Sequence, residues 1–126
     1  MRYLVDTHIL IWHGENNPAL KSTTLTLLND PANELFISHA CLWEMAIKVS
    51  LGKLKLASSV EQIGQELGQN GFTLLPFDLA HYGVLSTLPF HHNDPFDRMM
   101  IAQAICEQLE VITYDDKFKL YPVKLN

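Results

Sequence analysis

The chain has 126 residues, 48% of them hydrophobic, and only six glycines and six prolines. This length and composition exclude a disordered segment and predict a single domain over residues 1–126 with its own core. Nine Lys and Arg against fourteen Asp and Glu give a formal net charge of -5 at pH 7. That balance disfavours a module that holds nucleic acid by a basic surface alone, but not a nuclease whose carboxylates are balanced by bound cations.

The location of the protein is also constrained by composition. No apolar run reaches the ~20 residues that a membrane span needs. The opening MRYLVDTHILIWH contains Asp6 and His8 and lacks a small-residue cleavage site. We therefore expect no signal peptide, no membrane association and a cytoplasmic protein. Cys41 and Cys106 lie in apolar helical patterns, which predicts buried free thiols, with a lone disulfide as the alternative.

Strands and helices are expected to alternate along the chain, without repeats or linkers. In chain order, the predicted elements are a strand over 3–5, helices over 7–13 and 17–29, a strand over 34–37, helices over 38–51 and 58–69, a strand over 72–75, helices over 78–86 and 94–108, a strand over 111–113, a short turn of helix over 115–120 and a candidate edge strand over 122–124. This alternation indicates an α/β fold with a parallel sheet.

Local signals set several helix ends. Asn17 followed by Pro18 is typical of a capping residue and a first-turn proline, so the second helix is expected to begin there. Ser58 with Glu61 three residues later predicts a capping box for the fourth helix. Gly52 is expected to end the third.

The segment HHNDPFDRMMIAQA, residues 91–104, allows two interpretations. As a helix start, Asp94 is the N-cap, Pro95 suits the first helical position, and Asp97 stands where a capping-box acid reaches back. As a metal site, it offers two histidines and two aspartates. The two are compatible, because Asp94 can hold the turn while the helix N-terminus keeps Asp97 ionised and aimed at an ion.

Four acids are predicted to converge beyond the carboxyl ends of the strands, where α/β sheets gather functional groups. Asp6 follows the first strand, and Glu44 lies two turns into the helix after the second. Asp97 is in the first turn of the helix before the fourth strand, and Asp115 follows that strand. Oxygen-only ligation of this kind favours Mg²⁺ or Mn²⁺ over zinc.

Each acid also has a purely structural interpretation. Asp6 would cap the first helix, and Glu44 with Lys48 would be an exposed i,i+4 pair worth only ~0.3 to 0.5 kcal/mol. Asp97 would serve the helix start, and Asp115 would belong to a turn. Taken together, however, two carboxylates ~5 Å apart repel by roughly 3 kcal/mol at an effective dielectric of ~20, which favours a bound cation.

Four segments, LVDTHILIW, SHACLWEMAIK, DPFDRMMIAQA and VITYDDKF, in that order, resemble the PIN-domain family. They look most like the toxin ribonucleases of VapBC-type toxin–antitoxin pairs. The resemblance covers residues 3 to about 123. It implies a three-layer α/β/α sandwich around a parallel sheet of four to five strands, and a Mg²⁺- or Mn²⁺-dependent endoribonuclease site.

The resemblance also implies roles for individual residues. The catalytic and metal-ligating acids of the family fall on Asp6, Glu44, Asp97 and Asp115. The family pattern also places supporting hydroxyls at Thr7 and Ser38 and a threonine at Thr113. Outside that pattern, position in the sequence makes Asp94 (chiefly a cap), Arg98 and Asp116 further supporting candidates. Arg98 would pair with Asp97 or with a phosphate, and Asp116 would replace Asp115 if the strand ends one residue later. His91 and His92 are expected in a solvated or loop-packing role, with contact to RNA or metal as the alternative.

The main functional hypothesis is a toxin that cleaves structured RNA such as tRNA or rRNA. The resemblance implies that a small antitoxin inserted into the acidic site inhibits it and that it forms a homodimer, for which apolar helix faces such as Ile9, Ile11 and Trp12 leave room. Two alternatives stay open at this point. One is a metal-dependent phosphohydrolase acting on a small phosphate ester. The other is a catalytically inactive module whose acidic groove binds a basic partner peptide.

Overall fold

The computed structural model describes residues 1–126 and contains a four-stranded sheet and six α-helices. The elements are β1 (Arg2–Val5), α1 (Thr7–Gly14), α2 (Ser22–Asn29), β2 (Glu34–Ser38), α3 (His39–Ser50), α4 (Val60–Gln69), β3 (Phe72–Leu75), α5 (Leu79–Thr87), α6 (Pro95–Glu107), β4 (Glu110–Ile112) and the 3-10 helix η1 (Asp116–Leu120). The strands pair in the order β3-β2-β1-β4, and every pair is parallel. The predicted α/β class is confirmed.

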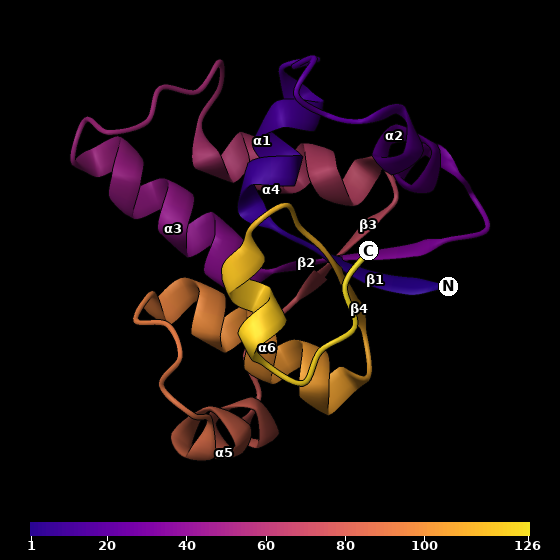
Figure 1. Ribbon diagram of the computed structural model, residues 1–126. Coiled ribbons are helices and arrows are strands. Elements are labelled where there is room, and N and C mark those ends of the chain that lie inside the picture. The colour runs from indigo at the N-terminus through magenta and orange to yellow at the C-terminus, as the bar shows by residue number, and fades with distance from the viewer.

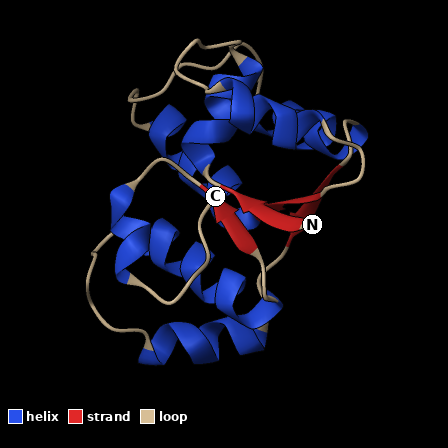
Figure 2. Ribbon diagram, turned by 45° about the vertical axis from the view of Figure 1, so that its right-hand side comes forward, coloured by secondary structure: helices blue, strands red, loops and turns tan.

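Helices cover both faces of the sheet, which makes three layers (Figures 1 and 2). Helices α1, α2 and α4 lie on one face, and α5 and α6 lie on the other. Right-handed crossovers explain this division. The chain runs from β1 to β3 in one direction and then crosses back to β4, on the far side of β1. The carboxyl ends of β1 and β4 therefore flank the switch point where α/β sheets place their sites.

The core is a continuous cluster of 23 buried residues. The strands contribute fully buried side chains such as Leu4 and Ile37, as expected for a sheet covered on both faces. Helix α6 is buried from Arg98 to Ala104, so its position against the sheet is fixed along two turns. Both cysteines are free, as predicted, although Cys106 is only partly buried. None of the helices has the length and apolar character that crossing a membrane requires.

Most of the predicted helix ends are confirmed. The side chains of Ser38, Asp78 and Asp94 cap α3, α5 and α6. Gly52 follows the end of α3 with φ +71°, a left-handed conformation that glycine adopts without the steric cost of a Cβ.

The predicted start of the second helix at Asn17-Pro18 is wrong. The Asn17 side chain accepts a hydrogen bond from the backbone N–H of Ala19 (2.9 Å), which closes a turn, and α2 begins only at Ser22. Its N-cap, Lys21, makes no side-chain cap. The Lys21 N–H instead donates to the Tyr114 hydroxyl (3.0 Å). The acceptor for this backbone N–H is thus a tyrosine distant in sequence, a contact that the local sequence does not reveal.

The predicted capping box of the fourth helix does not form, and the N-cap lies one residue later than expected. Ser59 is the N-cap, and its hydroxyl accepts from the N–H of Gln62 (3.1 Å). Glu61 is therefore the second helical residue and cannot complete a box with Ser58. Serine at both positions made the two starts indistinguishable in the sequence.

The candidate edge strand over 122–124 is reduced to a single parallel bridge between Val111 and Leu125. The Val123 N–H donates to the Tyr121 carbonyl (2.8 Å), so the backbone turns instead of pairing along β4. The sheet consequently keeps four strands.

Candidate active site

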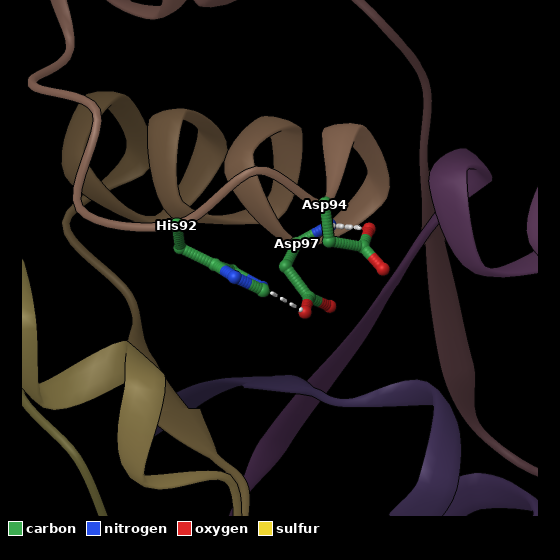
Figure 3. A group of neighbouring side chains, drawn as sticks. All are labelled: His92, Asp94 and Asp97. Atoms are coloured by element: carbon green, nitrogen blue, oxygen red, sulfur yellow. Dashed lines mark hydrogen bonds and ion pairs between the residues drawn. The ribbon is translucent and has the colours of Figure 1, made fainter.

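The segment that opens α6 contains two acids, of which Asp94 caps the helix and Asp97 does not. Asp94 Oδ1 accepts from the backbone N–H groups of Phe96 (2.9 Å) and Asp97 (3.1 Å). The Asp97 carboxylate does not reach back to Asp94. Its Oδ2 lies 2.8 Å from His92 Nε2, and the two side chains point at each other in Figure 3. The expected capping-box role of Asp97 is therefore wrong, and capping falls to Asp94 alone.

Asp6 lies at the carboxyl end of β1 and is 3% exposed. Its Oδ1 accepts from the Thr7 N–H (2.7 Å), which caps α1, and its Oδ2 accepts from the Thr113 hydroxyl (2.8 Å). Burial nevertheless raises the pKa of Asp6 above its ordinary value, and the nearby Glu44 carboxylate raises it further. Asp6 thus combines the capping role with a place in a group of acids.

Glu44, on α3, is also buried, with 4% of its surface exposed. Its Oε2 accepts from the Lys48 ammonium (2.9 Å). The interpretation of this pair as an exposed surface contact is wrong, because one partner is buried and only Lys48 reaches solvent. The hydrogen bond to Glu44 raises the pKa of Lys48, and the negative charges of Asp94 and Asp97 raise it further. Lys48 is therefore the lysine that partly balances this acidic region.

The electrostatics place four carboxylates in one region. The pKa of Asp97 rises to about 6, chiefly through burial and then through the charges of Asp94, Asp6 and Glu44, while the His92 hydrogen bond opposes the rise. A carboxylate such as Asp97, whose pKa is raised by burial and by acidic neighbours, is under-compensated and has an oxygen atom available for a cation. This donor set fits a hard divalent cation, which prefers oxygen ligands and would relieve the repulsion.

Asp115 is tied to the same edge through its backbone. Its N–H donates to the Thr113 hydroxyl (3.0 Å), the same hydroxyl that holds the first acid, and its carboxylate accepts from the Lys117 N–H (2.9 Å) to cap η1. Asp116 is exposed and pairs with Lys119 (2.9 Å). Of these two acids, Asp115 is the one that the hydrogen bonds join to the site.

The other predicted hydroxyls differ in their contacts. The Ser38 hydroxyl accepts from the Ala40 N–H (2.9 Å) and donates to Gln103 of α6, so it docks α3 against α6. The Thr7 hydroxyl is buried without a hydrogen-bond partner, which leaves a polar atom available beside Asp6.

Arg98 does not pair with Asp97, so that expectation is wrong. Its guanidinium is buried and donates to the carbonyls of Leu88 (3.1 Å) and Pro89 (2.8 Å) and to the Tyr121 hydroxyl (3.1 Å). Through these three hydrogen bonds, Arg98 ties the loop before α6 to the segment after η1. Arg98 is a structural anchor next to the site.

His92 is a candidate that sequence reasoning undervalued. Ligand atoms of His92, Asp94 and Asp97 all lie within 4.8 Å of one another (Figure 3). A histidine two residues before an N-cap lies near the first helical turn, and this proximity to Asp97 was the available signal. By contrast, the His91 ring packs edge-on against Tyr121, which agrees with a loop-packing role.

Comparison with known proteins then decides the family. The family model of the PIN domain matches residues 3–124. The chain belongs to the PIN-domain family. This confirms the resemblance inferred from the four sequence segments. No curated protein matched the sequence of this PIN domain.

Solved structures share the fold at low sequence identity. VapBC2 from Rickettsia felis, bound to a DNA fragment from its promoter, has a TM-score of 0.73 and 22% identity, over 100% of this PIN domain and 98% of that chain. VapBC-1 from nontypeable Haemophilus influenzae has a TM-score of 0.68 and 19% identity, covering 100% and 97%. DNA-bound VapBC from Salmonella typhimurium has a TM-score of 0.68 and 17% identity, also covering 100% and 97%.

Proposed function

We propose that this PIN domain is a metal-dependent endoribonuclease and the toxin of a VapBC-type toxin–antitoxin pair. The observation that supports this most is the convergence of buried Asp6 and Glu44 with half-buried Asp97, from three separate segments, with Lys48 paired to Glu44. An acidic cluster of this kind is costly to a fold unless a cation balances it. The cluster lies beyond the carboxyl ends of the parallel strands, where catalytic groups of α/β proteins gather.

Mg²⁺ or Mn²⁺ is the proposed cofactor, held by Asp6, Glu44 and Asp97 directly or through water. When bound, such an ion neutralises phosphodiester charge and lowers the pKa of a bound water. The protein contributes by holding its carboxylates in place, with Asp115 proposed to orient the attacking water. In-line attack on phosphorus with cleavage of the P–O3′ bond would leave a 5′-phosphate and a 3′-hydroxyl.

A small antitoxin is the proposed partner, and structured RNA such as tRNA or rRNA is the proposed substrate, met in the cytoplasm. The solved structures with this fold are VapBC complexes, which supports the partner. A hollow of about 540 Å³ lies between α1, α2 and α4, and its apolar lining includes Leu10, Met45 and Phe72. Its size and composition suit apolar side chains of such a partner.

A homodimer is also proposed. Of the three residues considered for its interface, Ile11 lines the hollow described above. Ile9 lies in the core and Trp12 packs against it. Exposed apolar side chains occur instead on α3 and α5, where Trp43 is 56% exposed and Leu79 and Tyr82 also face solvent. Monomeric behaviour in sedimentation equilibrium would refute the dimer without touching the nuclease.

The nuclease is tested by incubating 5′-labelled tRNA and rRNA with wild type, Asp97→Asn and the matched control Asp116→Asn, with Mn²⁺ or with EDTA. Loss of one proposed ligand should lower the cleavage rate by ~10³-fold or more, a cost of about 4 kcal/mol. The control, whose acid is exposed and paired with Lys119, should cleave within about twofold of wild type.

The outcomes separate the competing functions. Full cleavage by both Asp97→Asn and Asp6→Asn would refute the assignment of the site. Mn²⁺-dependent hydrolysis of small phosphate esters with no action on any RNA would favour a phosphohydrolase. Binding of a basic peptide without any response to Mn²⁺ would favour a catalytically inactive module.

A further inference from the structure

We infer that His92 is a positioning residue for Asp97: its ring N–H holds one carboxylate oxygen, so that the other oxygen faces the metal ion. This inference rests on the proposed metal-dependent function. It adds a residue from outside the acidic set and assigns it a role that does not require direct contact with the ion.

His92 and Asp97 form a close and largely buried pair. His92 Nε2 and Asp97 Oδ2 are 2.8 Å apart, and their side chains are 9% and 14% exposed. At this distance to an ionised carboxylate, Nε2 carries the hydrogen and donates it. Asp97 Oδ1 accepts no hydrogen bond, so the carboxylate is held at one oxygen and free at the other. Such outer hydrogen bonds orient metal-ligating carboxylates.

The protein also fixes the backbone of His92. The Tyr121 hydroxyl contacts the His92 carbonyl (3.5 Å) and accepts from the His91 N–H (3.1 Å). Buried Arg98 binds the same hydroxyl, and its guanidinium lies 3.8 Å from the centre of the Phe90 ring. The loop that carries His92 is thus clamped between α6 and the segment after η1.

The same contacts explain why Arg98 lies beside Asp97 without pairing with it. The guanidinium is committed to the loop carbonyls of Leu88 and Pro89. The arginine therefore acts on Asp97 indirectly, by holding the loop that presents His92. An Arg98–Asp97 ion pair would occupy the carboxylate and remove it from the ion.

Direct metal ligation by His92 is less consistent with the site. The 2.8 Å contact is a hydrogen bond that already occupies Nε2, and Asp94 Oδ1 is committed to two backbone N–H groups. The acids around Asp97 supply oxygen ligands, the set preferred by Mg²⁺ and Mn²⁺, whereas imidazole suits zinc and later transition metals.

The test measures Mn²⁺ affinity, not cleavage. Free Mn²⁺ is titrated by electron paramagnetic resonance at neutral pH, below the unfolding temperature, with wild type, His92→Phe, His92→Gln and His91→Phe. His92→Phe keeps a ring but loses the donor, and should weaken binding about tenfold or more. His92→Gln retains an N–H donor and should recover most of that loss. His91→Phe keeps its ring beside Tyr121 and should bind as wild type.

Each result decides between the readings. Unchanged affinity in His92→Phe, or no recovery in His92→Gln, overturns the positioning role while Mn²⁺ binding by wild type leaves the proposed function standing. Nitrogen hyperfine coupling to bound Mn²⁺ that disappears in His92→Phe also overturns it, because His92 would then be a ligand. Absence of Mn²⁺ binding by wild type overturns this inference and the metal-dependent function together. A purely structural histidine would lower the unfolding midpoint and leave the affinity of the folded protein unchanged.

Discussion

Asp97 and Arg98 are consecutive residues at the start of α6, carry opposite charges, and are both withdrawn from solvent. Their surroundings differ. Arg98 is 5% exposed and meets two carbonyls and a hydroxyl. Asp97 meets a single histidine, and its pKa is raised to about 6 chiefly by burial and further by the charges of three other acids. The arginine is satisfied by hydrogen bonds within the fold, whereas the acid is not.

This difference separates a scaffold from a site. A buried charge with well-placed hydrogen-bond partners contributes to a defined native state, because its removal leaves those partners unpaired. A buried acid among acids raises the free energy of the native protein until a cation binds. Both groups serve one region of the molecule, since the Arg98 contacts fix the loop that faces Asp97. Removing the charge of Arg98 should therefore destabilise the metal-free protein, whereas removing the charge of Asp97 should stabilise it.

The largest effect on stability is expected for Arg98→Met. The substitution leaves the carbonyls of Leu88 and Pro89 and the Tyr121 hydroxyl without their donor, and should lower the free energy of unfolding by about 3 kcal/mol. Urea unfolding in EDTA measures this. A loss below about 1 kcal/mol would contradict the anchoring role of Arg98.

The next effect is stabilisation by metal. With a dissociation constant of ~1 mM, ~10 mM Mn²⁺ should add about 1.4 kcal/mol to wild type, which raises the midpoint of thermal unfolding by roughly 4 to 7 °C. Asp97→Asn should lose most of this shift. Equal shifts in both proteins would show that Asp97 is not a ligand.

A smaller effect is expected from pH in the metal-free protein. The pKa of Asp97 is about 6 in the folded protein, against an ordinary value of 3.8. The folded state therefore binds more protons than the unfolded state between pH ~4 and ~6, and the unfolding free energy falls as pH rises through that window. Above pH ~6 this contribution is constant.

Asp97→Asn should reduce the decrease in unfolding free energy with rising pH. The metal-free variant should therefore be more stable than wild type at neutral pH. Urea unfolding in EDTA at pH 4, 5, 6 and 7 gives the comparison, and the difference between the two proteins isolates Asp97 from other titrating groups. A wild type that gained stability relative to the variant across this window would contradict the raised pKa.

The smallest effect is expected for Asp116→Asn. Its exposed pair with Lys119 is screened by solvent, and such pairs contribute little to stability. The unfolding free energy should change by no more than about 0.5 kcal/mol, and Mn²⁺ affinity should be unchanged. A clear loss of Mn²⁺ affinity would instead transfer the role of Asp115 to Asp116.

The sequence predicted the elements and the segments that meet at this edge, because periodicity, caps and strand ends are local signals. It missed contacts between distant residues. The Tyr114 hydroxyl meets the start of α2 from 93 residues away, and Arg98 meets Tyr121 across 23. A charged pair such as Asp97 and Arg98 looks complementary in sequence, and only the packing of the loop shows that they are directed to different partners.

The parallel strand order has one consequence for the time at which the site becomes complete. Asp6 receives the hydroxyl of Thr113, 107 residues further along the chain. While β4 is still inside the ribosome, Asp6 of a nascent chain lacks its hydrogen bond from Thr113. Asp115, which follows β4, is also absent from the site at that stage. Such long-range pairing also slows folding. The hydrogen bonds that hold Asp6 can therefore be completed only after β4 and Thr113 have emerged from the ribosome.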